Sequence, residues 1–221
     1  MSILSDYTTE NYLKAIVKYL ATPGKTKIST GELAALLKVT SGTTTTMIKK
    51  LEREGYVSYI SHQGCSLTAK GMRYGLRILR RHRLLETFLV NVLDLTWDEA
   101  HEEAEKLEHS TSDYLVDKID QYLNYPTKGP SGNMIPRKEQ TDYMLKDTPL
   151  IEAPLNTEIV ISRVSSNSKM ASYFQAEGLL PGARITLLDI NREVGIATAK
   201  MESGIKNLSL VALNHLYYEK G

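Results

Sequence analysis

The sequence predicts a mainly α-helical fold that ends in a small β-barrel, and three observations lead to this prediction. Apolar residues recur at helical spacing through most of residues 12–123. Three prolines and two glycines between residues 124 and 136 end that pattern. Short segments of alternating apolar residues begin at Glu158 and continue almost to the end of the 221-residue chain.

The first third of the chain predicts a helix, a second helix, a tight turn, a third helix and a hairpin. The expected helices cover 12–20, 31–38 and 43–53, and two short strands are expected within 56–68. Ser29 and Glu32 form a capping box before the second helix, and Gly55 ends the third. This order is that of a winged helix-turn-helix, in which the second helix of the pair enters the DNA major groove.

The third expected helix carries side chains suited to DNA. Threonine hydroxyls can bond phosphate oxygens, threonine methyls can meet thymine methyls, and lysine or arginine neutralises phosphates. The alternative is that the threonines only cap a helix. The expected DNA-contacting residues are Thr40, Gly42, Thr43, Thr44, Thr46, Lys49, Lys50 and Arg53.

Residues 96–123 contain the most specific pattern of the chain. Thr96 and Glu99 form a capping box. His101, Glu105, Glu108 and His109 follow at spacings that would place them on one stripe of a single helix. Upstream, at 69–93, Thr68 caps a long helix in which His82 and Glu86 are four residues apart. Imidazoles and carboxylates so arranged predict a divalent-metal site, and the alternative is a solvated acidic face.

The charge pattern supports both a DNA partner and a metal-ion ligand. Residues 1–80 carry twelve Lys and Arg against five Asp and Glu, whereas residues 81–125 carry four against eleven. A basic first third favours a polyanion and an acidic middle favours a cation. The single cysteine, Cys65, excludes an intrachain disulfide. Without a signal-peptide pattern or an apolar run of ~20 residues, we expect a cytoplasmic protein with no membrane partner.

Several segments together resemble the diphtheria-toxin-repressor family of metal-dependent transcriptional repressors. They are TTENYLKAI, RRHRLLE, the run H-x-x-x-E-x-x-E-H from His101 to His109, NYP followed by PSGNMIP, and GLLPG. The resemblance implies a homodimer that binds double-stranded operator DNA when loaded with Mn²⁺ or Fe²⁺ and that controls genes of metal-ion homeostasis. It also implies that the last domain is an SH3-like barrel.

The resemblance further implies two metal sites. The principal site matches Asn11, Glu105, Glu108 and His109, and the second matches His82, Glu86 and His101. A carboxylate at position 105, where iron-responsive members have cysteine, places the ligand pattern closest to the manganese-transport regulators, because carboxylates suit harder ions.

Two departures from the family pattern stand out in α-helical segments, and a third in the barrel. Asn11 replaces the usual methionine or aspartate, and Lys14 stands where short manganese regulators have glutamate. The barrel stretch that usually lends a ligand offers only Ser165, Ser166, Asn167 or Met170. We therefore expect the barrel to modulate stability or DNA affinity, and a chain cut after Arg137 to keep metal-dependent DNA binding.

The expected domains are a winged helix-turn-helix at 1–73, metal-binding and dimerisation helices at 74–140, a linker at 141–155 and the SH3-like domain at 156–221. Dimerisation is expected through 88–92 and 114–123. We find no nucleophile–base pair, phosphate loop or dinucleotide motif and expect no enzyme. The competing hypotheses are a metalloenzyme using the His/Glu stripe and a protein-interaction module.

Overall fold

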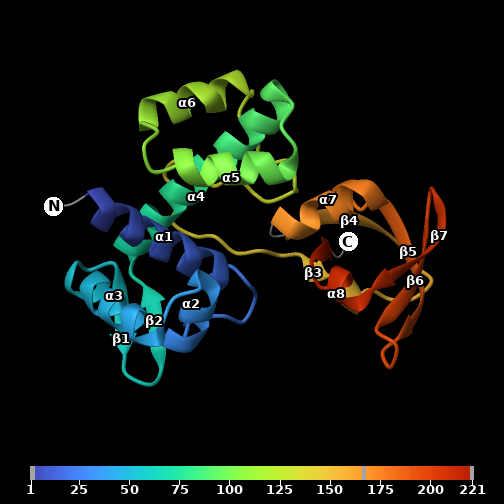
Figure 1. Cartoon of the computed structure of the whole chain (residues 1–221), viewed down its shortest axis with the longest axis horizontal. Helices are drawn as coiled ribbons and strands as arrows, with labels where there is room; N and C mark the ends of the chain where they lie inside the picture. Colours follow the sequence, from blue (N-terminus) through green and yellow to red (C-terminus); the bar gives the residue numbers. More distant parts are fainter. Residues whose placement is uncertain (1–2, 166–167, 220–221) are drawn as a thin grey trace. The chain divides into compact units, whose positions relative to one another are not determined.

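The computed structural model describes residues 3–165 and 168–219, which form two compact units. The N-terminal unit contains residues 1–82, 106–117 and 135–145, and the C-terminal unit contains 83–105, 118–134 and 146–221. Figure 1 labels their helices and strands. In the described part of the chain, no helix combines the length and the apolar composition needed to span a bilayer.

The winged helix-turn-helix expected at the start of the chain is confirmed. Helices α1 (Ile3–Leu20), α2 (Thr30–Leu37) and α3 (Ser41–Arg53) precede a hairpin of β1 (Val57–Ile60) and β2 (Gly64–Leu67). Their core is a cluster of fully buried side chains that includes Leu13, Ile16, Leu33, Ile48 and Leu51. The amphipathic spacing of three short helices therefore forms one hydrophobic core.

Helix α1 begins nine residues before the expected start at Tyr12. Residues 8–11, TTEN, have low helix propensity, which is why their pattern did not predict a helix. Thr9 and Glu10 are nonetheless buried, and the Tyr7 ring stacks on His109. Tertiary contacts thus extend the helix where local propensity does not favour it.

The predicted cap of α2 is present as hydrogen bonds, and the structure adds a cap at α3. Ser29 and Glu32 form both bonds of a capping box, and the Glu32 backbone N–H donates to Ser29 Oγ at 3.1 Å. The Thr40 hydroxyl accepts from the Thr43 N–H at 3.2 Å. Because Thr40 is the cap, α3 starts at Ser41, two residues before the expected start.

Two glycines allow the elements of this unit to approach closely. Gly64 has φ +94°, and a Cβ there would collide with the Ile28 carbonyl beside the hairpin. Gly75, on α4 (Ala69–Leu93), faces α1, where a Cβ would lie 2.6 Å from Cγ2 of Val17. A larger residue at either position would push these elements apart.

The expected single helix from Thr96 is wrong, because the structure breaks it into α5 (Trp97–Leu107) and α6 (Asp113–Tyr122). The Thr96–Glu99 capping box is confirmed. At the break, the hydroxyls of Ser110 and Thr111 both donate to the Leu107 carbonyl. Hydrogen bonds from side chains to the last helical carbonyl compete with the backbone hydrogen bonds that would continue the helix. Glu108 and His109 consequently lie in the turn and not on the α5 stripe.

Residues 141–155, the expected linker, contain the boundary between the two units, and each half packs into a hydrophobic core. Tyr143 is 3% exposed and packs with Val17, Ala21, Leu76 and Leu79 of the N-terminal unit. The Leu145 N–H donates to the Ala21 carbonyl at 2.9 Å. In the C-terminal unit, Leu150 is fully buried. The first half of the segment is packed against α1 and α4 without being a regular helix or strand, so its burial leaves no periodic pattern.

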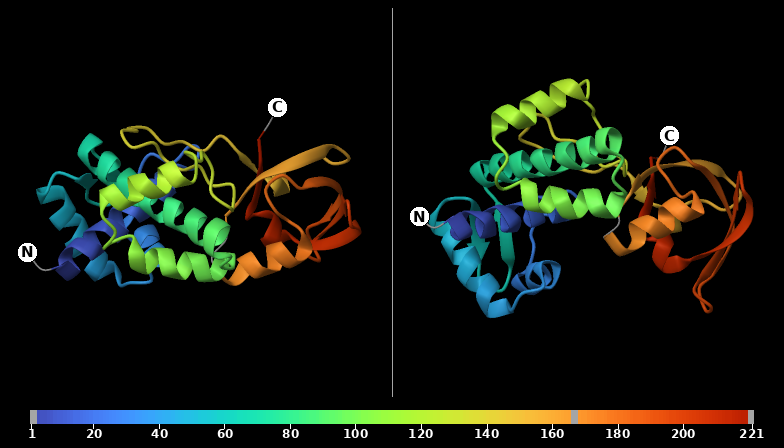
Figure 2. Two further views of the ribbon diagram at one scale, coloured as in Figure 1. Left: turned by 90° about the horizontal axis from the view of Figure 1, so that it is seen from above. Right: turned by 45° about the horizontal axis from the view of Figure 1, so that its top comes forward.

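The C-terminal unit is built on a six-stranded antiparallel sheet of order β3-β8-β4-β5-β6-β7, which Figure 2 shows as strongly curved. The strands are β3 (Thr148–Pro149), β4 (Glu158–Val164), β5 (Arg184–Asn191), β6 (Ile196–Met201), β7 (Gly204–Ser209) and β8 (Leu216–Tyr218). The short helices η1 (Leu150–Glu152), α7 (Ser168–Glu177) and α8 (Leu210–Leu213) complete it. Register shifts in β4 and β5 bend the sheet around Phe174, which is fully buried. Trp97 of α5 packs against the same core.

Candidate metal centre

The Glu108 carboxylate lies at the middle of a buried polar cluster in the N-terminal unit. Its side chain has no exposed surface. Oε1 lies 2.5 Å from Nζ of Lys14 and 3.3 Å from Nε2 of His109, whereas Oε2 lies 2.7 Å from Nδ1 of His82. The break after α5 therefore brings the carboxylate to side chains from α1 and α4.

Helix α1 also holds His109 in a fixed orientation. Nδ1 of His109 lies 2.5 Å from Oε2 of Glu10, and the Tyr74 hydroxyl donates to Oε1 of Glu10 at 3.1 Å. Burial, and next the charge of Glu10, raise the pKa of Tyr74 to about 12, so the phenol stays a donor at neutral pH. A carboxylate on one imidazole nitrogen typically directs the other nitrogen toward a metal. Here that nitrogen is Nε2, which faces Glu108.

Two buried oxygens indicate whether the site suits a metal. Among the described residues, the buried Oδ1 of Asn11 and Oε2 of Glu108 accept no hydrogen bond. A buried acceptor without a hydrogen bond is costly, and such oxygens are ligands for hard divalent ions. Asn11 lies three residues before Lys14 and hence on the helix face that reaches Glu108. The residues fit a cation with oxygen and imidazole ligands.

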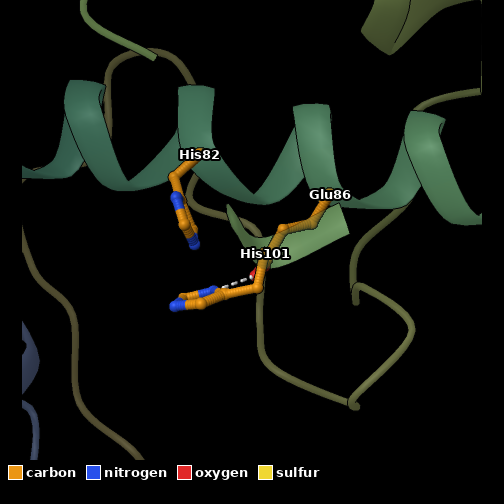
Figure 3. A group of neighbouring side chains, drawn as sticks. All are labelled: His82, Glu86 and His101. Atoms are coloured by element: carbon orange, nitrogen blue, oxygen red, sulfur yellow. Dashed lines mark hydrogen bonds and ion pairs between the residues drawn. The ribbon is translucent and has the colours of Figure 1, made fainter. Parts of the chain in front are cut away.

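A second group contains the other predicted ligands. Nδ1 of His101 on α5 lies 2.7 Å from Oε1 of Glu86, and Nε2 of His101 lies 4.0 Å from Oε1 of Glu105. His82 is one helical turn before Glu86 on α4, and Figure 3 shows His82, Glu86 and His101 as neighbouring side chains. Two imidazoles and a carboxylate form a set that zinc, iron or manganese can accept.

The sequence pattern missed two members of the principal cluster. Glu10 is not among the predicted site residues, although it directly precedes the predicted ligand Asn11. Lys14 was noted only as a departure from the family pattern, and its ion pair with Glu108 joins residues 94 positions apart. Within the barrel stretch, Ser165 pairs with His215 through its backbone and Met170 packs against the core. Ser166 and Asn167 lie outside the described residues.

The structure exposes most of the predicted DNA-contacting residues on α3 and at its cap. Thr40, Gly42, Thr43, Thr46, Lys49 and Arg53 are exposed. Lys50 is half-buried, and its Nζ lies 3.3 Å from Thr9 Oγ1 and 3.8 Å from Glu54 Oε1. Thr44 is fully buried, and its hydroxyl donates to the Thr40 carbonyl. Its side chain faces the domain core and is not available to DNA.

Comparison with known proteins matches two consecutive family models to the chain. The model described as iron dependent repressor, N-terminal DNA binding domain, matches residues 6–65. The model described as iron dependent repressor, metal binding and dimerisation domain, matches residues 68–137. The first covers the winged helix-turn-helix, including the α1 residues of the buried polar cluster, and the second covers α4 to α6 with Glu108, His109 and His82.

Individual relatives extend the similarity to almost the whole chain. The chain is 28% identical to the iron-dependent repressor IdeR of Mycobacterium leprae over 193 residues, which are 81% of this chain and 83% of the relative. It is 31% identical to the HTH-type transcriptional regulator MntR of Oceanobacillus iheyensis, over 52% of this chain and 77% of the relative. A solved manganese-dependent transcriptional repressor in complex with manganese superimposes with a TM-score of 0.88 at 32% identity, covering 96% of this chain and 100% of the other.

Proposed function

The chain belongs to the iron-dependent repressor family of metal-dependent transcriptional repressors, and from this premise we propose which of its residues bind metal, DNA and a second subunit. The family resemblance inferred from the sequence motifs is thereby confirmed. The observation that supports the proposal most is the buried Glu108 carboxylate, which lies between Lys14 of α1 and His82 of α4 and whose Oε2 accepts no hydrogen bond.

We assign Asn11, Glu105, Glu108 and His109 to the principal metal centre. Glu108 and His109 lie side by side in the turn after α5, and Asn11 is proposed as a ligand from α1 because it is three residues before Lys14, which contacts Glu108. Glu105 is proposed as the fourth ligand from its place three residues before Glu108. A bound divalent ion would offset the carboxylate charge and link α1 to this turn. The ligands are oxygen and imidazole without a thiolate, which favours Mn²⁺, with Fe²⁺ as the alternative.

A second centre is assigned to His82, Glu86 and His101. Glu86 and His101 already contact each other, and His82 projects from the same face of α4 as Glu86 (Figure 3). His82 also lies 2.7 Å from Glu108 of the principal centre. One imidazole therefore lies next to ligands of both centres, and we propose that occupancy of one site affects the other.

The proposed coupling to DNA follows from the position of α1. This helix carries Asn11 and packs its other face into the core that supports α3, through Leu13 and Ile16. Fixing α1 against the turn after α5 would fix the orientation of the reading helix. Since metal and DNA then favour the same conformation, each must raise the affinity for the other by the same factor.

A titration of promoter DNA with the full chain tests this function. We expect binding with Mn²⁺ or Fe²⁺, weaker binding with Mg²⁺ and none above the non-specific level after chelation. The coupling typical of allosteric proteins corresponds to roughly 5- to 150-fold in affinity. DNA affinity that is the same with Mn²⁺ and with chelator would contradict the proposal.

The DNA-binding surface is proposed to comprise Thr40, Gly42, Thr43, Thr46, Lys49, Lys50 and Arg53, without Thr44. In the same titration, Lys49→Ala combined with Arg53→Ala should weaken binding to all sequences. It should also lower the slope of log affinity against log salt by about 2, because two phosphate contacts are lost. Arg192→Ala combined with Lys200→Ala removes the same charge from the C-terminal unit and is the control. An unchanged salt slope in the α3 variant would show that α3 does not face the phosphates.

The homodimer is proposed to form through α6. This helix exposes large apolar side chains, with Tyr114 72%, Leu115 50% and Tyr122 69% exposed. Such a surface on one short helix is typical of a subunit interface. Sedimentation at micromolar concentration should find a dimer in the wild type and a monomer for Tyr114→Asp with Leu115→Asp. Val194→Asp, at a 66% exposed position of the C-terminal unit, is the control. A wild-type monomer with and without Mn²⁺ would refute this interface.

A further inference from the structure

Lys14 is a buried lysine whose ammonium lies inside the proposed metal centre. Its side chain is 7% exposed, and the Glu108 side chain that it contacts is 0% exposed. Nζ of Lys14 lies 2.5 Å from Oε1 of Glu108, which is also the oxygen that faces Nε2 of His109 at 3.3 Å. The ammonium therefore lies against one oxygen of the carboxylate whose other oxygen, Oε2, accepts no hydrogen bond and would ligate an ion.

The contact ties together two parts of the chain that the metal is proposed to join. Lys14 is on α1 and Glu108 is in the turn after α5, 94 residues later. Both charges are buried, so removing either one would break this ion pair in a low-dielectric environment. The ion pair consequently stabilises the docking of α1 in the metal-free chain.

We propose that Lys14 is an internal cation that competes with the activating metal for Glu108. This inference rests on the proposed metal centre and adds a residue that sets the free metal concentration at which the centre becomes occupied. An ammonium 2.5 Å from Oε1 and a divalent ion bound to the same carboxylate at the ~2.0–2.2 Å of a metal–oxygen bond lie close together, and their charges repel. The contact between Nζ of Lys14 and Oε1 is therefore weakened or lost when Glu108 becomes a metal ligand.

This competition has a consequence for the concentration at which the repressor responds. Part of the attraction between metal and Glu108 is offset by the lost contact with Lys14. The affinity for the metal is lower than the same ligands would have without the lysine. The chain therefore becomes loaded only at a higher free metal concentration, and Lys14 sets that concentration without being a ligand.

The test compares Lys14→Met with Lys18→Met in the full chain. Methionine keeps most of the side-chain volume and removes the charge, and Lys18 is an exposed lysine on the same helix. By calorimetry with Mn²⁺ in the absence of DNA, Lys14→Met should bind at least about tenfold more tightly than wild type. Its metal-free melting temperature should fall by roughly 10 °C, because Glu108 loses its counter-charge, and added Mn²⁺ should recover that loss. Lys18→Met should match wild type in both measurements.

A folded Lys14→Met variant with wild-type or weaker Mn²⁺ affinity would overturn the inference, because Lys14 would then support Glu108 as a ligand or play no part. If the variant folds only with metal, the inference is tested instead by NMR on the wild-type chain labelled with ¹⁵N-lysine. The Lys14 ammonium resonance should shift on saturation with diamagnetic Cd²⁺, and a resonance unchanged on saturation would overturn the inference. Failure of the metal centre itself is distinct, since wild type would then bind no ion in the calorimeter.

Discussion

Replacing Glu108 with glutamine is expected to abolish metal-dependent DNA binding and to remove one bound ion per chain. Glutamine keeps the shape of the side chain but removes the charge that faces Lys14, His82 and His109. The centre then has a buried ammonium and one carboxylate fewer, so a divalent ion is no longer favoured there. DNA affinity at saturating Mn²⁺ should fall to the chelated level, a loss of roughly 5- to 150-fold.

The same variant should lose stability, because the buried ammonium of Lys14 loses its ion pair with Glu108. Breaking a buried pair in this way typically costs about 3–5 kcal/mol. Circular dichroism must therefore show a folded chain before DNA binding is interpreted. Glu102→Gln, which removes an exposed acid from α5, is the matched control and should bind metal and DNA as wild type does. Mn²⁺-dependent DNA affinity at the wild-type level in folded Glu108→Gln would mean that this cluster is not the activating site.

Replacing Tyr143 with alanine is expected to lower the free energy of unfolding of the N-terminal unit by about 3–5 kcal/mol. Tyr143 is 3% exposed and fills a core made by α1 and α4, where alanine would leave a cavity. Thermal unfolding of the full chain should show this as a fall of roughly 10 °C in Tm. Val194→Ala, at a position of the C-terminal unit that is 66% exposed, should change the free energy of unfolding by no more than about 0.5 kcal/mol.

The Tyr143 result also decides where a truncated chain should end. A cut after Arg137, which the sequence pattern suggested, would remove Tyr143 and the hydrogen bond between Leu145 and Ala21. A cut after Leu145 would keep both. Wild-type stability of Tyr143→Ala would show that Tyr143 contributes little to this core and would favour the cut after Arg137.

Much of the fold follows from local sequence. The Ser29–Glu32 and Thr96–Glu99 capping boxes were predicted and are present as hydrogen bonds. The order of three helices and a hairpin at the start was likewise predicted and is observed. Caps and turns depend on residues within about four positions of one another, and helical faces on a period of 3.6 residues. The ligand types and the basic helix α3 could be inferred from residue chemistry in the same way.

The sequence by itself thus determined the metal-dependent repressor family and the order of elements in the first third of the chain. Only the tertiary structure decided how these residues meet. It buried Thr44, packed Tyr143 against α1 and α4, and ended α5 before Glu108. It also paired Lys14 with Glu108 across 94 residues and placed Glu10 on His109 across 99. The reason is physical: periodicity and capping report interactions along one element, whereas burial and ion pairing depend on which elements pack together, and no local spacing encodes that.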